Sequence, residues 1–110
     1  MATAYKILGQ SAPANTSNAD LYTVPTSTST IVSTISITNT TATVALATVY
    51  IRKAAAAVAT GNALVYTQAI PAYSTVTYTN GITLATTDVI TINTTTASAL
   101  TFQAFGSELS

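Results

Sequence analysis

Short runs of β-branched and aromatic residues, separated by turn-forming residues, are the feature that most limits what this chain can fold into. The runs follow one another about every 8–12 residues, a spacing typical of antiparallel sandwiches and small barrels. Parallel strands would require crossover helices, and the sequence has no convincing helical segment. We therefore predict an all-β fold, an antiparallel β-sandwich of eight or nine short strands. The runs cover residues 5–8, 21–24, 31–38, 43–52, 64–70, 75–79, 82–84, 89–94 and 100–105.

The third and fourth runs predict which side chains share a face. The third run alternates with a period of two, the pattern of a half-buried strand. In the fourth run both faces are apolar, so we expect this strand at the centre of a sheet or against a partner. One face of the third run is predicted to hold Ile31, Ser33, Ile35 and Ile37, and the other Val32, Thr34, Ser36 and Thr38.

Glycine, proline and asparagine mark the predicted turns. Asn80-Gly81 favours a two-residue hairpin turn, because both residues tolerate positive φ. Residues 9–18 are predicted to form a loop. The Ala-rich residues 53–62 are predicted to form a second loop with at most one helical turn, since so short a helix is marginal on its own.

The length of 110 residues suits one domain. A chain of this size buries roughly 65% of its unfolded surface, which is enough to fold without disulfides or metals. We expect a single β-sandwich domain over residues 1–110. Its short terminal segments are predicted at residues 1–4 and 106–110, the second of them a polar tail.

Ionisable side chains are scarce. Charged residues make up 5% of the chain and there is no His or Cys, whereas an ordinary domain is about 25% charged. Without His or Cys, the usual zinc, haem and iron–sulfur sites and the Cys–His and Ser–His–Asp nucleophile systems cannot form. Three basic residues neutralise too few phosphates for firm nucleic-acid binding, and no run of about 18 apolar residues predicts a membrane helix. We expect no enzyme activity, cofactor or metal, and no nucleic-acid or membrane partner.

Three carboxylates remain as candidates for acid–base or metal chemistry. Asp20 precedes a predicted strand, Asp88 lies in a predicted turn, and Glu108 lies near the last residue. Asp at turns hydrogen-bonds the nearby backbone, so a structural role is favoured over glycoside hydrolysis, and Asp20 or Asp88 could form at most a weak calcium site. A Ser–Lys dyad at Lys6 or Lys53 is conceivable, but 25 Thr and 10 Ser residues place some hydroxyl near a lysine by chance.

Six tyrosines supply most of the aromatic area. Each lies in or beside a predicted strand, which favours core packing with the hydroxyl at the rim over a sugar-binding platform. They are Tyr5, Tyr22, Tyr50, Tyr66, Tyr73 and Tyr78.

The low charge also bears on partners. A surface with almost no charge and a net charge of zero suits a free, concentrated monomer poorly, and sheet edges without lysines tend to pair with other strands. Composition therefore favours a structural subunit, and we expect a homo-oligomer. Arg52-Lys53 is either a solvated strand end or a contact to an acidic partner surface. The expected partner contacts are residues 2–8, with Tyr5 and Lys6; residues 53–62, with Arg52 and Lys53; and the unpaired sheet edges.

Six segments of the chain share a set of turn and strand patterns: Asp20-Leu21-Tyr22-Thr23-Val24-Pro25, Ile35-Ser36-Ile37-Thr38-Asn39-Thr40, Ile70-Pro71-Ala72, Gly81-Ile82-Thr83-Leu84, Thr87-Asp88-Val89-Ile90 and Phe105-Gly106-Ser107-Glu108. These segments resemble small β-sandwich virion proteins of tailed bacteriophages, many of them marine or cyanobacterial. The resemblance extends over roughly residues 8–108 and is carried by turn and strand patterns. It implies an immunoglobulin-like or jelly-roll sandwich that decorates capsids, or attaches to necks, tails and fibres, in many copies. No functional residues of that group carry over to this chain.

Three functional hypotheses follow. The first is a capsid decoration, or cement, protein that binds the major capsid protein or other virion proteins and pairs with its own copies. The second is a tail, neck or fibre component, and the third is a carbohydrate-binding module. Residues 1–10 have one positive charge and no apolar core of about 7–15 residues, so no signal peptide is predicted. We expect a virion location after assembly in the host cytoplasm.

Overall fold

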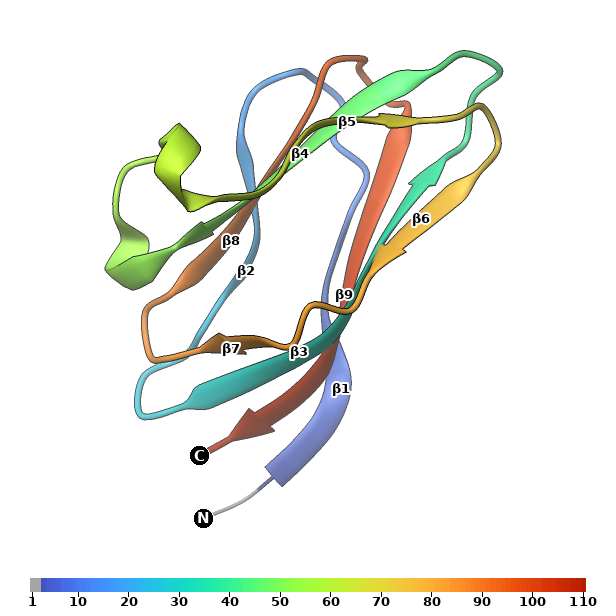
Figure 1. Cartoon of the computed structure of the whole chain (residues 1–110). Helices are drawn as coiled ribbons and strands as arrows, with labels where there is room; N and C mark the ends of the chain where they lie inside the picture. Colours follow the sequence, from blue (N-terminus) through green and yellow to red (C-terminus); the bar gives the residue numbers. More distant parts are fainter. Residues whose placement is uncertain (1–2) are drawn as a thin grey trace.

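The computed structural model describes residues 3–110, which form two antiparallel sheets packed face to face (Figure 1). One sheet has the order β1-β9-β3-β6, with β7 also paired to β3, and the other has the order β2-β8-β4-β5. The predicted all-β sandwich is confirmed. The strands of the described residues are β1 (Thr3–Ser11), β2 (Ala19–Thr23), β3 (Ser29–Asn39), β4 (Ala45–Arg52), β5 (Ala63–Ile70), β6 (Thr75–Tyr78), β7 (Ile82–Leu84), β8 (Val89–Thr94) and β9 (Leu100–Leu109).

The path of the chain between the sheets is that of a jelly roll. Strands β6 and β7 pair with successive parts of the same edge of β3, so they act as one interrupted strand. Counted in this way, eight strands form two four-stranded sheets, as jelly rolls do. An immunoglobulin-like sandwich divides its strands between the sheets differently. The strand order thus separates the two sandwich types that the sequence left open.

A β-bulge in β3 overturns part of the predicted face pattern. The register between β3 and β9 shifts between Val32 and Thr34, so Ser33 is an extra residue on β3. One extra residue reverses which side chains face inward. Val32 is therefore buried together with the isoleucines at 35 and 37, whereas Ile31 is 55% exposed. The prediction that Ile31 shares a face with the other two isoleucines is wrong.

The predicted hairpin at Asn80-Gly81 is also wrong. Strand β6 pairs with β3 from Ile35 to Thr38, and β7 pairs with β3 from Thr30 to Val32. The two short strands therefore follow one edge of β3 in turn instead of pairing with each other. Gly81 still adopts the positive φ expected of it, at 71°, in the link between β6 and β7.

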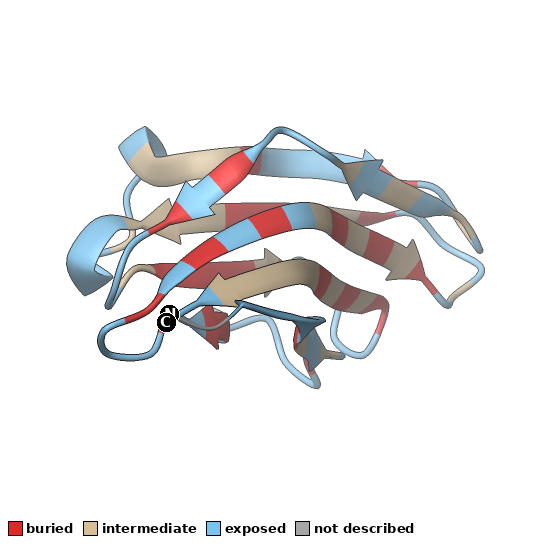
Figure 2. Cartoon of the chain, turned by 90° about the horizontal axis from the view of Figure 1, so that it is seen from below, coloured by how far each residue is buried: buried red, intermediate tan, exposed pale blue. Residues whose placement is uncertain are grey.

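The core lies between the sheets, and buried positions alternate with more exposed ones along strands such as β3 and β9 (Figure 2). Strand β4 has neighbours on both sides, as predicted, and buries Ala45, Ala47 and Val49. The largest fully buried apolar side chains are Phe102, Ile35, Ile37, Ile70, Ile90, Ile92, Leu100, Val24, Val32 and Val49.

Both chain ends and the Ala-rich loop differ from the prediction. Strand β9 continues to Leu109 where a polar tail was predicted, because residues 106–109 pair with both β1 and β3, which satisfies their backbone groups. Strand β1 begins at Thr3 within the predicted terminal segment and ends at Ser11 within the predicted loop; residues 1–2 lie outside the described residues. The Ala-rich loop contains two short 3₁₀ turns, η1 (Lys53–Ala55) and η2 (Thr60–Asn62), where at most one helical turn was predicted.

Candidate functional site

An apolar groove lies on the outer face of the β1-β9-β3 sheet, near the two chain ends. Tyr5, Ile31 and Phe105 line it together with the polar residues Ser33 and Ser107, and its volume is about 360 Å³. Lys6 and Gly106 complete the lining. Tyr5 is 86% exposed, the largest exposed fraction among the large hydrophobic side chains of the described residues.

Strand register explains why these residues meet. Ser107 of β9 lies opposite Tyr5 on one side and Ile31 on the other, and opposite residues point to the same face of an antiparallel sheet. In the next outward row, Phe105 lies opposite Ile7. The bulge in β3 turns Ile31 to the outer face, and the apolar groove therefore depends on this bulge.

A polar network lies at the same end of the sandwich, on the inner side of this sheet. The Lys6 ammonium lies 2.9 Å from Glu108 Oε1, and the Tyr22 hydroxyl donates to Glu108 Oε2. A phenol carries one proton, so the Thr30 hydroxyl, 2.8 Å away, donates to the Tyr22 oxygen. The hydrogen bond from Tyr22, and then Lys6, lower the pKa of Glu108. Burial, and then the bond to Glu108, raise the pKa of Tyr22 to about 12.

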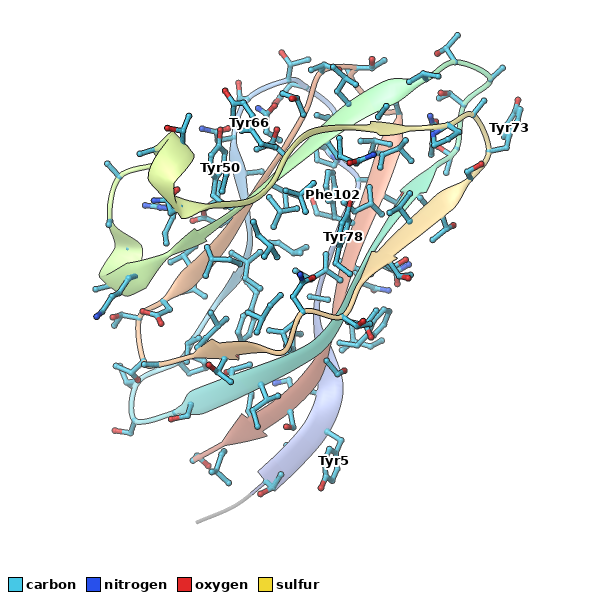
Figure 3. All side chains as sticks on the ribbon, in the orientation of Figure 1. Tyr5, Tyr50, Tyr66, Tyr73, Tyr78 and Phe102 are labelled. Carbon is cyan, nitrogen blue, oxygen red and sulfur yellow. The ribbon has the colours of Figure 1, made fainter. Side chains whose placement is uncertain are left out.

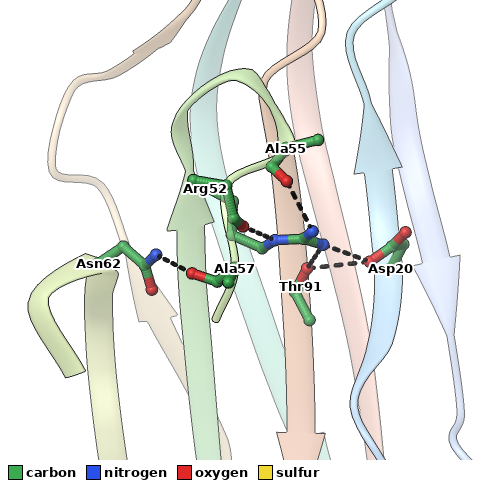
Figure 4. Close-up of polar contacts among 7 residues, drawn as sticks. Asp20, Arg52, Ala55, Ala57, Asn62 and Thr91 are labelled. Atoms are coloured by element: carbon green, nitrogen blue, oxygen red, sulfur yellow. Dashed lines mark hydrogen bonds and ion pairs between the residues drawn. The ribbon is translucent and has the colours of Figure 1, made fainter. Parts of the chain in front are cut away.

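Arg52 organises the Ala-rich loop (Figure 4). Its Nε donates to the Ala56 carbonyl at 2.6 Å and its Nη2 to the Ala55 carbonyl at 3.1 Å. Its Nη1 donates to Thr91 Oγ1 at 3.1 Å and lies 3.3 Å from Asp20 Oδ1. The guanidinium thus contacts two strands and the loop at once, which gives Arg52 a structural role. Neighbouring Lys53 is exposed, and a partner contact there stays a prediction.

The other carboxylates also act within the fold. Asp88 accepts the backbone N–H of Ala54 at 2.8 Å and that of Ala85 at 2.9 Å, as expected for Asp in a turn. Asp20 accepts from Thr91 at 2.9 Å beside Arg52. Across residues 3–110 there is no group of three or more His, Cys, Asp or Glu residues that could hold a metal.

Five of the six tyrosines fall into two sets, and the sixth, Tyr50 on β4, is partly buried. Tyr22 is buried and Tyr78 is partly buried against the core, as predicted, and burial raises the pKa of Tyr78. Tyr5, Tyr66 and Tyr73 are 86%, 57% and 74% exposed, so core packing is the wrong prediction for these three. They lie well apart from one another, on β1, on β5 and in the turn after β5 (Figure 3).

The predicted contact residues fall into two separate pairs. Tyr5 and Lys6 lie together on β1 beside the groove, whereas Arg52 ends β4 in the other sheet and Lys53 follows it. Sequence reasoning missed the outward turn of Ile31 and the part that Phe105 plays. The signal in the sequence is weak, because a glycine inside a strand often marks a bulge or a close backbone approach, whereas Gly106 falls at the start of the predicted polar tail.

None of the helical turns in residues 3–110 is long and apolar enough to cross a membrane. Comparison with known proteins gives no match to a family model, to a curated protein or to a solved structure.

Proposed function

We propose that this chain is a non-enzymatic structural protein of a phage virion, and specifically a capsid decoration protein that binds the major capsid protein in many copies. The observation that carries the proposal is the apolar groove on the outer face of the β1-β9-β3 sheet. A chain that leaves Tyr5, Ile7 and Ile31 exposed to water has a surface suited to being covered by a partner. Burying such side chains stabilises a contact by about 25 cal/mol per Å² of apolar area.

The chemistry around the groove suits a protein partner. The hydroxyls of Ser33 and Ser107 lie beside apolar Tyr5, Ile31 and Phe105. An apolar centre with a polar rim is the usual composition of a protein–protein interface. The one charged residue in the lining, Lys6, directs its ammonium group away from the groove to Glu108, on the inner side of the sheet. A contact of this size is weak alone, but repeated attachment to a shell makes it effective through avidity.

The fold and the sequence resemblance also support this proposal. Viral capsid domains and lectins are both built as jelly rolls, so the strand order is compatible with either a virion or a sugar-binding role. A fold alone does not specify function. Sugar binding through tyrosines would need neighbouring rings, and the three exposed tyrosines lie apart (Figure 3). The resemblance to virion proteins and the apolar groove therefore favour the structural role.

Co-sedimentation with virion parts tests the proposal. The purified protein is mixed separately with bare heads, tails and fibres of the source phage, and the bound copies per particle are counted. We expect saturable binding to heads at many copies per particle. Ile31→Glu places a charge in the groove and should weaken head binding about tenfold or more, since burial of such a side chain contributes about 1.5–3 kcal/mol. Val44→Glu is the matched control, because Val44 is similarly exposed, at 59% against 55%, and lies outside the groove.

The other outcomes each overturn a part of the proposal. Binding to tails or fibres alone would replace the capsid role with the tail, neck or fibre role. Binding to no particle would reject the virion role, and a glycan array would then test the carbohydrate-binding alternative. Equal loss of head binding in Ile31→Glu and Val44→Glu would remove the groove from the interface.

A further inference from the structure

The sandwich has four exposed sheet edges, and they differ in how well they could accept another strand. β2 has five residues and a register break between Asp20 and Tyr22, beside the Arg52 ion pair. The pairing of β5 with β4 has two register shifts, and Thr67 has a positive φ of 47°. β6 and β7 are short and separated. Breaks and short lengths of this kind protect edges against pairing.

The edge of β1 lacks this protection over its first half. Residues 3–7 pair with β9 in unbroken register, and in the described sheet no strand lies on their other side. The register shift comes only after Ile7, and beyond it Gly9 packs closely on the backbone of Leu21. Lysine is a common guard of sheet edges. Lys6, the one lysine in this segment, is held by Glu108 at 2.9 Å.

We propose that residues 3–7 pair antiparallel with the same residues of a second copy of this chain, with Tyr5 of each copy facing the other. This inference specifies the self-association expected of the proposed virion protein. Its test needs no virion particle, so either proposal can fail without the other.

Charge and face pattern favour a second copy and this register. The chain has a net charge of zero, so two copies do not repel each other at long range. In a two-fold antiparallel pair, odd-numbered residues lie opposite odd-numbered ones and even opposite even. The outer faces of the two copies then lie on the same side of the joined sheet. Centring the pair on Lys6 would oppose two ammonium groups. Centring it on Tyr5 sets Lys6 opposite Ala4 and Ile7 opposite Thr3, and brings the two exposed rings together.

The paired sheet would join the two apolar grooves into one surface. Tyr5 lies on the edge strand and lines the groove, so its ring can contact the copy on one side and face the groove of its own chain on the other. Five residues of strand pairing form a contact smaller than a standard stable interface of about 1,600 Å². We therefore expect a weak dimer, populated at high protein concentration or on a shell that holds copies side by side.

Cysteine cross-linking tests this pairing, because the chain has no cysteine of its own. Directly opposite residues in antiparallel strands have Cα atoms about 4.5–5.5 Å apart, within the range that a disulfide spans. Under mild oxidation, Tyr5→Cys should form a covalent dimer about tenfold faster than Tyr73→Cys, because pairing raises the effective thiol concentration. Tyr73 is the matched control, since it is 74% exposed and lies in the turn after β5.

A second measurement keeps the Tyr5 ring in place. A mixture of Thr3→Cys and Ile7→Cys chains should give more heterodimer than either variant alone gives homodimer. Equal dimer rates for Tyr5→Cys and Tyr73→Cys, with no heterodimer in the mixture, would overturn the pairing. Faster cross-linking between Tyr5→Cys and Ile7→Cys chains would overturn the Tyr5-centred register in favour of one centred on Lys6. Circular dichroism checks that each variant keeps the β-sheet fold.

Discussion

Gly106 of β9 lies so close to Ile31 of β3 that a Cβ atom at position 106 would overlap the Ile31 carbonyl oxygen. The contact occurs where the bulge at Ser33 brings the two backbones together. The glycine therefore permits the bulge, and the bulge turns Ile31 into the apolar groove. The absence of a Cβ atom at Gly106 therefore determines both the strand register and the position of Ile31 in the candidate interaction surface.

Substituting Gly106 should destabilise the fold. Gly106→Ala forces the β3 and β9 backbones apart, and overpacking of this kind costs about 1–3 kcal/mol. Urea unfolding followed by circular dichroism measures the change in the free energy of unfolding. Gly61→Ala is the control, because a Cβ atom there meets nothing within 4 Å, and it should change stability by less than about 0.5 kcal/mol. Equal effects of the two substitutions would contradict the close approach at Gly106.

Replacing Arg52 should loosen the Ala-rich loop. Arg52→Ala removes the bonds to the Ala55 and Ala56 carbonyls and to Thr91, and each such bond contributes about 0.5–1.5 kcal/mol. We expect a loss of about 2 kcal/mol in the free energy of unfolding, since partial solvation offsets part of the loss. Hydrogen exchange of residues 53–62 should become faster. The exposed neighbour supplies the control, because Lys53→Ala should leave both measurements nearly unchanged.

Local patterns predicted most of the strands, because β-branched runs and turn residues act over a few positions. The wrong predictions for the face pattern of β3 and for the Asn80-Gly81 hairpin share one physical cause, because both depend on pairing between strands that are distant in the sequence. The bulge at Ser33 depends on Gly106, 73 positions later, and the register it creates exposes Ile31. Long-range pairing also explains the failed hairpin prediction, because the strands on either side of Asn80-Gly81 pair with β3 and not with each other.

The candidate site was predictable in part. Tyr5 and Lys6 were identified from an uncharged surface and an N-terminal strand, and both line the groove. The rest of the groove comes from β3 and β9, whose register no local pattern shows. For the same reason the sequence did not reveal that Arg52 contacts Asp20 and Thr91, since these residues meet only when β2, β8 and β4 form a sheet.

Asn39 should be essential for the turn after β3. It is 1% exposed, and its side-chain amide donates to the Thr43 carbonyl at 2.8 Å and the Ile70 carbonyl at 2.9 Å, while its Oδ1 accepts from the Thr41 N–H at 2.9 Å. Asn39→Ala leaves these buried groups without partners, which costs about 2–4 kcal/mol in all. Asn93→Ala is the control, because Asn93 bonds the exposed loop at residues 16–18. A thermal melt of both variants should show the larger drop in Tm for Asn39→Ala.

The network of Lys6, Glu108 and Tyr22 should make stability depend on pH at both ends of the range. Glu108 has a pKa below its ordinary value of 4.5 in the folded chain, because Tyr22 and Lys6 hold its charged form. Its contribution is therefore present above about pH 4.5 and is lost as the pH falls through the folded pKa. Tyr22 has a pKa raised from 10.0 to about 12, so its contribution is present below pH 10 and is lost as the pH rises toward 12.

Two variants test the acidic and the alkaline parts of this pH dependence separately. Glu108→Gln removes the acidic titration, so its deficit in unfolding free energy relative to the native chain should shrink as the pH falls below 4.5. Tyr22→Phe removes the phenol whose pKa is raised to about 12, so absorbance titration of the remaining tyrosines should lose its step near pH 12. Tyr66→Phe, at an exposed position, is the control and should leave that step in place. Two outcomes would show that the network does not hold these two side chains in the states described. One is a step near pH 12 that survives in Tyr22→Phe, and the other is a Glu108→Gln deficit that is constant with pH. The reason is that linkage requires the shifted groups to release or take up protons on unfolding.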